Sequence, residues 1–550
     1  MSPTKALTLL ALGCMLLTAM VAGAASPADE KAPLRSALEA LREQSLTAHE
    51  RAELAALEAF YHLRNHRPAW ADEERLNRLD QAFRSLADDG LDPTHYLASR
   101  SPYPGLPTDD PRHHGQSICT EIDATRAFLR ALSDLRFGRL RPADVETIWR
   151  HREQPDALSS EGRLRSLVAT AVVTLDDPLA AFAAVRPSWP AYAGLRAAHA
   201  AERKRPDADA DTAVPSGPLL RPGMHDPRVP LLRQRFGIAP ESPDLANVYD
   251  ARLVTAIEAF QQANRLTVDG IIGPATLAVL NLDRAARLDK FRVNLERMRW
   301  LAGEHHRRFV LVDVAGAWIH YYRDGEAVWS TRAQVGRPTR RTPLLVSEIT
   351  HFTFNPTWTI PPTILRNDKL PEIRADIGYL ARNNIRVLDH EGNPLSPEAI
   401  DWERPGPILL RQDAGPDNAL GRVAIRFPNP FHVYLHDTPS QRLFERDQRA
   451  FSSGCVRVQQ ADTLVDLLLA DDGGDTLERA QRLRSGTRTA NFSLNQPVAV
   501  LLTYLTVDIA DDGTPIFRPD VYRLDENVLR ALNAAPPASA LHTRCVWLDG

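Results

Sequence analysis

The residues best suited to chemistry lie close together in the last quarter of the chain. Residues 433–439 contain His436, and residues 451–458 contain Cys455. A cysteine nucleophile needs a base that takes its proton, preformed donors for an oxyanion and a group that holds the substrate. His436 can act as the base, and Arg457 suits a substrate carboxylate. We therefore expect acyl transfer on Cys455.

The residues next to Cys455 indicate a tight, exposed turn. Gly454 permits such a turn, which exposes the sulfur and aims main-chain N–H groups at one point. If residues 455–458 are extended, Cys455 and Arg457 point to the same face. Ser453 lies in the turn, and the other candidates for the cleft are Trp358, Tyr434 and Ser452.

A structural role for the same residues is the main alternative. A lone cysteine is most often a small, inert core residue, but Ser-Ser-Gly before Cys455 and an arginine soon after it are poor core neighbours. His432 lies four residues before His436, so it is an alternative base or a surface histidine. Trp358 is more typical of packing beside a cleft than of a substrate contact.

Several other enzyme classes lack their motifs in this sequence. There is no H-E-x-x-H or comparable spacing, so a zinc amidase or carboxypeptidase lacks its ligands. S-x-x-K occurs only at residues 2–5, no K-T-G follows, and there is no G-x-S-x-G. Papain-like hydrolases place the cysteine before the histidine, whereas here His436 comes first. A net charge of −4 gives no case for nucleic acid, and we expect no cofactor or metal.

The secondary structure that must position these residues is expected to differ between parts of the chain. Residues 26–203 are mainly helical in pattern, and residues 205–217 are a polar, proline-bearing linker. Residues 364–421 form a long insertion with a helix over 370–382, and such a loop at a strand junction is often functional, for example a lid. Another helix is expected over 461–469. Short β-branched and aromatic runs predict strands over 309–314, 317–322, 328–331, 345–354, 423–435, 498–507 and 516–517.

Residues 220–283 predict a compact bundle of three short helices. Residues 229–236 and 254–261 each have one apolar face, residues 269–274 form a turn, and a third helix covers 275–280. The unit resembles the type 1 peptidoglycan-binding domain through its Ala-Phe-Gln helix and its Asp-Gly-x-x-Gly turn. The alternative is a helical spacer that binds no ligand.

The N-terminus predicts export. Lys5, an apolar run over 6–21 and small residues at 22–26 are typical of a secretory signal cleaved after Ala24. The alternative is a retained inner-membrane anchor. Cleavage leaves Cys119, Cys455 and Cys545, so at least one thiol is free or pairs outside the chain. A Cys119–Cys545 bridge is one of the pairings that stay open. We expect the protein in the periplasm.

The His436 and Cys455 segments together resemble the catalytic signature of YkuD-type L,D-transpeptidases, in which His-Gly/Asp-Thr precedes Ser-x-Gly-Cys-x-Arg. The resemblance implies that His436 is general base and acid and that Cys455 is acylated. It also implies that Gly454 and Cys455 donate to the oxyanion and that Arg457 orients the stem peptide. Many single-domain members have histidine where this chain has Ser453, so the role of that position stays open. The group that orients the His436 ring is either a backbone carbonyl or the carboxylate of the next residue.

The resemblance is to the large periplasmic subfamily and covers nearly all of the mature chain. It rests on Tyr61, Trp70 and the strings at 89–92, 292–301, 335–338, 342–343, 355–361, 427–430 and 518–522. It implies a multidomain α+β protein with a mainly β catalytic domain. The expected parts are a signal peptide at 1–24, a helical N-terminal domain at 25–204, a linker at 205–219, the peptidoglycan-binding-like domain at 220–283, a connecting helix at 284–308, the catalytic domain at 309–510 with its lid insertion at 364–421, and a C-terminal extension at 511–550.

The resemblance also implies a reaction. The donor is a tetrapeptide stem cut before its terminal D-Ala, and a diaminopimelate amine of a neighbouring stem accepts the acyl group from Cys455 to give a 3→3 cross-link. This chemistry belongs to cell-wall organisation and cell shape. Carbapenems are the expected inhibitors, and other wall-synthesis enzymes are candidate partners. The alternatives are an L,D-carboxypeptidase, a lipoprotein-anchoring transpeptidase or a non-catalytic wall-binding scaffold.

Overall fold

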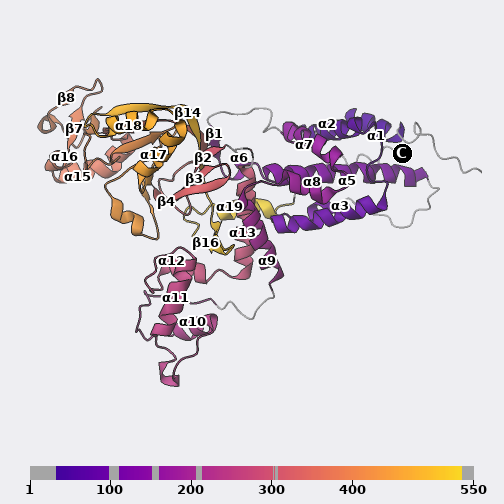
Figure 1. The fold of residues 1–550 in the computed structure, drawn as a ribbon, viewed down its shortest axis with the longest axis horizontal. Helices are drawn as coiled ribbons and strands as arrows, with labels where there is room; N and C mark the ends of the chain where they lie inside the picture. Colours follow the sequence, from indigo (N-terminus) through magenta and orange to yellow (C-terminus); the bar gives the residue numbers. More distant parts are fainter. Residues whose placement is uncertain are drawn as a thin grey trace, which may run out of the picture.

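The computed structural model describes residues 32–97, 111–150, 160–205, 213–301, 303 and 307–535. The expected signal peptide, Cys545 and residues 206–212 of the expected linker lie outside these ranges. Figure 1 shows a helical body, a β-rich body and a narrow helical arm, which meet around α13 (Arg284–Trp300). This arrangement confirms the expected multidomain α+β class. None of the described helices combines the length and the apolar character that a membrane crossing needs.

The helical body forms because each of its longer helices has one apolar face. Helix α2 starts with a capping box in which Thr47 and Glu50 satisfy each other's main-chain N–H groups. Phe60, Phe128 and Phe182 are fully buried in the shared core. Its elements are α1 (Ala32–Arg42), α2 (Ala48–Leu63), α3 (Glu73–Ser85), η1 (Leu86–Asp89), α4 (Thr94–Leu97), α5 (Pro111–Phe137), α6 (Pro142–Val145), α7 (Ser160–Val173) and α8 (Pro178–Val185).

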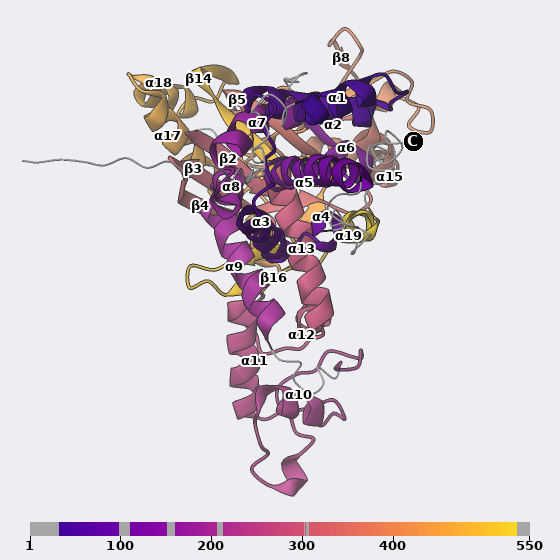
Figure 2. The ribbon, with the colours of Figure 1, turned by 90° about the vertical axis from the view of Figure 1, so that its right-hand side faces the viewer.

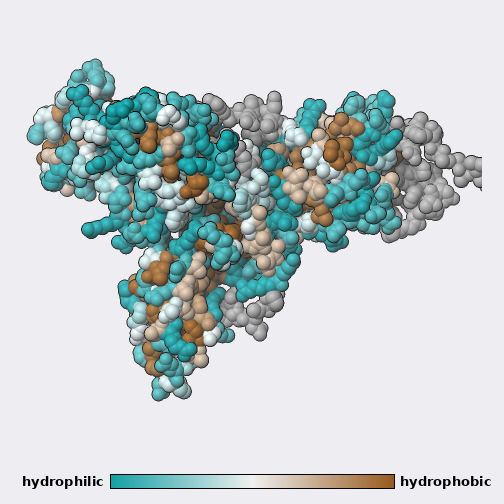
Figure 3. Space-filling model, in the orientation of Figure 1, coloured by the Kyte–Doolittle hydropathy of each residue, from teal (hydrophilic) through white to brown (hydrophobic). Residues whose placement is uncertain are grey.

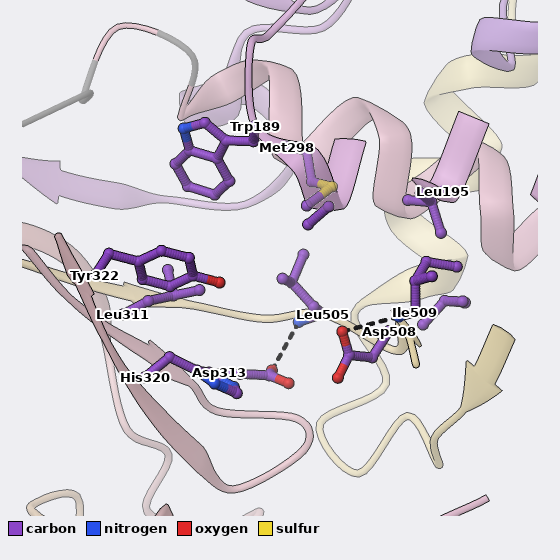
Figure 4. A pocket seen from close by; sticks show the side chains of 12 residues that line it. Trp189, Leu195, Met298, Leu311, Asp313, His320, Tyr322, Leu505, Asp508 and Ile509 are labelled. Carbon is purple, nitrogen blue, oxygen red and sulfur yellow. Dashed lines mark hydrogen bonds between the residues drawn. The ribbon is translucent and has the colours of Figure 1, made fainter. Parts of the chain in front are cut away.

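Helix α9 (Pro190–Lys204) contacts both the helical body and the rest of the chain, since its Tyr192 and Arg196 hydrogen-bond to Asp89 of η1. Its Leu195 packs in a core shared with Phe291 of α13 and Phe309 of the catalytic sheet. Figure 4 shows the junction, where Trp189, Met298 and Asp508 face a small cavity of about 50 Å³. The helix therefore connects the helical body to α13 and to the β-rich body.

The β-rich body is one sheet that closes on itself, because β5 pairs with both β10 and β14. Its strands run in the order β1-β5-β10-β11-β13-β4-β3-β2-β14, and β12 pairs with β4. Helices α17 (Ala461–Asp472) and α18 (Thr476–Arg484) follow the Cys455 segment. The strands are β1 (Ile148–Arg150), β2 (Arg308–Asp313), β3 (Trp318–Arg323), β4 (Glu326–Gly336), β5 (Leu344–Phe354), β10 (Val423–Arg426), β11 (Leu435–His436), β12 (Ala450–Ser452), β13 (Val456–Val458) and β14 (Ala490–Thr503).

The insertion is a small subdomain with a sheet and a core of its own. Its strand order is β6-β9-β7-β8, and Ile373, Leu380 and Leu410 are buried together. Figure 1 places it at the end of the β-rich body that lies farthest from the helical body. Its elements are β6 (Trp358–Thr359), α14 (Pro362–Ile364), the π-helix η3 (Leu365–Lys369), α15 (Leu370–Ala375), α16 (Gly378–Arg382), β7 (Ile385–Leu388), β8 (Pro394–Leu395), η4 (Pro397–Ala399) and β9 (Leu409–Gln412).

The arm contains α10 (Val229–Phe236), η2 (Pro243–Leu245), α11 (Ala251–Ala263) and α12 (Pro274–Leu280), and Figure 2 shows it standing away from both bodies. The buried amide of Gln261 holds the following turn, since its Oε1 accepts from the N–H groups of Asp269 at 3.1 Å and Gly270 at 2.9 Å. The Ala-Phe-Gln and Asp-Gly motifs therefore support each other structurally. Figure 3 shows apolar residues on the arm surface, where the exposed large side chains include Leu219, Met224 and Val268.

The C-terminal segments form a two-stranded sheet and a helix that packs on α13. β15 (Val507–Ile509) pairs with β16 (Pro515–Phe517), and α19 (Asp525–Asn533) packs on α13. A buried ion pair of 2.9 Å joins Arg297 of α13 to Glu146. Such a pair is costly to break because it would leave an uncompensated charge in the interior.

Candidate active site

Two neighbouring strands bring the predicted site residues to one face of the sheet. β11 runs parallel to β13, with Leu435 opposite Val456 and His436 opposite Arg457. Because side chains alternate along a strand, Cys455 shares the face of Arg457. By the same period, Tyr434 shares the face of His436. The structure thus gathers Tyr434, His436, Cys455 and Arg457 on one side.

His436 is buried, with 4% of its surface exposed. Its Nδ1 lies 2.5 Å from the main-chain oxygen of Asp437. This carbonyl, and not the Asp437 carboxylate, orients the ring, because the carboxylate accepts from the Arg422 N–H at 2.9 Å. A proton on Nδ1 leaves Nε2 as a free base. Burial and the nearby Arg457 lower the pKa of His436 from 6.5 to about 3.

Cys455 is the free cysteine of the described residues, whereas Cys119 is disulfide-bonded. Its sulfur lies 3.9 Å from the main-chain oxygen of His432, and within the described ranges no hydrogen bond joins it to the His436 ring. Burial raises the pKa of the thiol, while Tyr434 and nearby arginines partly oppose that effect. The resting pair is therefore an uncharged thiol and an uncharged imidazole.

The turn before Cys455 is held by its own serine. Gly454 has φ +119°, a left-handed conformation that favours glycine. The Gly454 N–H donates to Ser452 Oγ at 3.1 Å, and that hydroxyl donates to the Cys455 carbonyl at 2.5 Å. Ser452 thus occupies the Gly454 N–H that the sequence assigns to the oxyanion. The Gly454 carbonyl accepts from Thr342 Oγ1 at 2.9 Å.

Gln334 fixes Arg457, and sequence analysis did not identify it. Its Oε1 accepts from Arg457 Nη1 at 3.0 Å, and its Nε2 donates to the Ser440 carbonyl at 3.1 Å. Gln334 is fully buried in β4 between Ala333 and Val335. A lone amide inside an apolar strand is the signal that could have found it, because such a group needs partners.

The Ser453 hydroxyl lies between two arginines of the β4–β5 loop. It accepts from Arg340 Nη1 at 2.9 Å and from Arg337 Nη2 at 3.2 Å. Both arginines also pair with Asp368 of η3. Position 453, whose role the sequence left open, therefore joins the nucleophile turn to the insertion.

The remaining candidates have different positions. The guanidinium of Arg426 lies 4.0 Å from the centre of the Tyr434 ring, which in turn lies 5.7 Å from the His436 ring. His432 is exposed and meets the thiol through its carbonyl. Trp358 packs against the core of the insertion, as the packing interpretation predicts.

This closed sheet, with a free cysteine and a buried histidine on adjacent strands, has the parts that cysteine-based acyl transfer needs. Residues 307–500 match the family model of the L,D-transpeptidase catalytic domain. Residues 55–198 match a scaffold domain, and residues 233–280 match a "Putative peptidoglycan binding domain".

One curated protein and several solved structures are similar to parts of the chain. The chain is 36% identical over 242 residues to a Haemophilus influenzae protein named "Putative L,D-transpeptidase", a match covering 44% of this chain. The match spans 48% of that relative, about half of its length. An L,D-transpeptidase from Mycobacterium smegmatis is 13% identical, with a TM-score of 0.18 over 36% of this chain and 58% of that one. One from Xylanimonas cellulosilytica is 16% identical, with a TM-score of 0.17 over 52% and 98%.

Proposed function

We propose that the protein is an L,D-transpeptidase that forms 3→3 peptidoglycan cross-links through a thioester on Cys455. The observation that carries the proposal is the shared sheet face of Tyr434, His436, Cys455 and Arg457, within a domain of the L,D-transpeptidase catalytic family. The donor is a tetrapeptide stem and the acceptor is the side-chain amine of diaminopimelate on a second stem.

Acylation begins from the uncharged pair. The Cys455 thiol gives its proton to His436 Nε2 as its sulfur attacks the carbonyl before the terminal D-Ala. The carbonyl π-electron pair moves to oxygen, then returns as the C–N bond breaks. His436 gives the proton to the departing D-Ala amine, which leaves a thioester on Cys455. Because the pKa of His436 is lowered to about 3, its proton is readily given up in this step.

Deacylation repeats the same proton transfers with an amine in place of the thiol. The acceptor amine attacks the thioester carbonyl and loses a proton to His436, and the Cys455 sulfur leaves and recovers that proton. Arg457, fixed by Gln334, is suited to hold a donor carboxylate. Since Ser452 engages the Gly454 N–H, the Cys455 N–H is the proposed oxyanion donor of this turn.

We assign three supporting roles to the rest of the chain. The insertion acts as a lid over the cleft, and deleting it without loss of turnover would contradict that role. The arm binds the wall, as supported by its match to a peptidoglycan-binding family. The protein works in the periplasm after export, which the disulfide at Cys119 supports because disulfides persist in oxidising compartments.

The first experiment is the intact mass of the purified protein after incubation with a carbapenem. We expect an adduct of one inhibitor on the parent and none on a Cys455→Ala variant. A Ser453→Ala variant is the control for local disturbance of the turn, and it should still be acylated. Absence of an adduct on the parent would contradict the proposed acyl-enzyme.

The acyl acceptor needs a separate measurement. Purified disaccharide-tetrapeptides should give a 3→3 cross-linked dimer and free D-Ala in equal amounts. Release of D-Ala with a tripeptide and no dimer would instead identify an L,D-carboxypeptidase. Mass spectrometry of the products, with the Cys455→Ala variant as the blank, distinguishes these outcomes.

A further inference from the structure

A cluster of opposite charges joins the nucleophile turn to the insertion. Arg340 Nη2 lies 3.1 Å from Asp368 Oδ1, and its Nη1 contacts the second oxygen, so the two groups pair through both carboxylate oxygens. Arg337 Nη2 lies 3.5 Å from the same carboxylate. Ser453, two residues before Cys455, accepts from both guanidinium groups. The cluster is thus directly beside the nucleophile.

The arginines are held by the catalytic domain, whereas the carboxylate comes from the insertion. The Arg337 N–H donates to the Ser452 carbonyl at 3.0 Å, and the Tyr522 hydroxyl accepts from the Thr342 N–H at 3.1 Å. The loop that carries Arg337 and Arg340 is therefore fixed to the nucleophile turn. If the insertion moves, the arginines remain and Asp368 leaves.

Two features indicate that the arginines form a site for an anion. A bidentate pairing through both carboxylate oxygens is the geometry in which guanidinium groups recognise carboxylates. With Asp368 removed, the guanidinium groups of Arg337 and Arg340 would both point at the neutral Ser453 hydroxyl. The buried Nε of Arg337 already lacks a hydrogen-bond partner within the described residues. Arg340 is 18% exposed and Asp368 is 29% exposed, so water reaches the pair only in part.

Asp368 lies on the π-helix of the insertion. This π-helix, η3, follows two consecutive prolines and precedes α15. A π-helix is rare and is frequently found at functional sites. A change of η3 to a regular helix would shift the Asp368 carboxylate without unfolding the core of the insertion.

We infer that Arg337 and Arg340 form a second carboxylate site beside Cys455, which Asp368 occupies until an acidic group of the donor peptide displaces it. The inference rests on the proposed function for the identity of the donor. Arg457 holds one donor carboxylate, and the Arg337–Arg340 site holds another. Substrate binding then releases the contact that keeps the insertion on the turn.

The test measures peptide binding on a Cys455→Ala background, where no turnover occurs. We compare a stem tetrapeptide with its counterparts in which one carboxyl group at a time is amidated, by calorimetry. The Arg340→Gln substitution should weaken binding of the acidic peptide about tenfold or more, as expected for loss of a charge-assisted hydrogen bond. The peptide that is amidated at the carboxyl group bound by this site should bind the parent and Arg340→Gln with equal affinity.

The complementary variant is Asp368→Asn, which removes the internal competitor. It should bind the acidic peptide more tightly than the parent, and iodoacetamide should alkylate its Cys455 faster in the otherwise unchanged chain. The matched control is Asp413→Asn, which alters an exposed ion pair of 2.6 Å with Arg386 in the same insertion, and it should change neither quantity.

The inference would be overturned if Asp368→Asn bound the acidic peptide more weakly than the parent does. It would also be overturned if Arg340→Gln changed the affinity for all of the peptides equally, which would leave the cluster as a structural clamp. Thermal unfolding of each variant identifies any that fail to fold, and the Asp368→Asn arm still decides if Arg340→Gln is one of them. Because binding and alkylation need no catalysis, this inference and the proposed function can fail separately.

Discussion

At Cys455 and His436, burial opposes charge on both partners. The pKa of the thiol is raised and that of the imidazole is lowered to about 3. A preformed thiolate–imidazolium pair is therefore disfavoured in the resting state. In the proposed mechanism, proton transfer is coupled to attack on the substrate, so the free protein should react slowly with simple alkylating agents and rapidly with an acylating inhibitor that fills the cleft.

The buried His436 should also make the catalytic domain sensitive to acid. The unfolded chain takes up a proton below pH 6.5, whereas the folded domain resists it until about pH 3. Stability is thus lost as pH falls from 6.5 toward 3, by about 1.4 kcal/mol per pH unit from this group. When the pH is lowered from 7 to 4.5, the free energy of unfolding measured in urea should fall by about 3 kcal/mol less for a His436→Asn variant than for the parent.

The control for that titration is His390→Asn in the insertion, whose side chain is 76% exposed. It should follow the parent across the same pH range. Equal acid sensitivity of the parent and His436→Asn would show that the imidazole is protonated in the folded domain. Tryptophan fluorescence and far-UV circular dichroism should be compared, because a multidomain chain need not unfold in one step.

Residue types predicted Cys455 and His436 but not all of the groups that support them. The spacing of the two segments identified the pair because their chemistry requires those side chains. The group that orients His436 is a main-chain carbonyl. Every residue carries such a carbonyl, so no residue type in the sequence could have identified it. Gln334 and Arg340 act through long-range pairing of β4 and its following loop with the nucleophile turn, and such pairing depends on sheet register.

At the scale of elements, the longer periodic segments were predicted best. The helix over 461–469 corresponds to α17, and the strand over 345–354 corresponds to β5. The expected single strand over 423–435 is divided into β10 and β11. The sheet of the insertion was not predicted, because its strands are short, two of them only two residues long, and depend on their partners.

The β4–β5 loop is the element on which the nucleophile turn rests. An added Cβ at Gly336 would lie 2.2 Å from the Arg340 carbonyl oxygen, so the loop folds tightly over a residue without a side chain. The Tyr522 hydroxyl accepts from the Thr342 N–H at 3.1 Å and donates to the Gly336 carbonyl. The C-terminal extension thereby fixes the active-site loop.

A Tyr522→Phe variant should therefore lose about 1 to 3 kcal/mol of stability, because it leaves a buried donor and a buried acceptor without partners. It should also lower turnover while the protein stays folded. Tyr322→Phe is the matched control, since its ring stacks on Phe309 at 4.6 Å and keeps that contact. Urea unfolding monitors the first effect and D-Ala release the second, and a neutral Tyr522→Phe would contradict the bracing role.

At the scale of the whole molecule, polar contacts join the arm to the catalytic domain beside the apolar core that Val279 of the arm shares with Phe309. Arg265 of the arm pairs with Asp508 at 2.9 Å and lies 5.5 Å from the centre of the Trp318 ring. Thr267 bonds to Asp447, which belongs to the segment between His436 and Cys455. The arm thus touches the loop that connects the two predicted catalytic residues. Each contact is partly exposed and should contribute only about 1 kcal/mol.

Weak contacts of this kind predict an arm that can be released by small changes. Asp508 also pairs with Arg518, so replacing Asp508 would disturb the catalytic domain itself. We therefore replace the arm residues, in a double variant with Arg265→Ala and Thr267→Val. Small-angle X-ray scattering should show a larger radius of gyration for this double variant, with turnover of soluble muropeptides retained. Arg252→Ala, an exposed change on the same arm, should leave the radius unchanged. If the arm positions the catalytic domain on the wall, cross-linking of intact sacculi should fall in the double variant alone. A constant radius would mean that the arm is held by the apolar contacts of α13 instead.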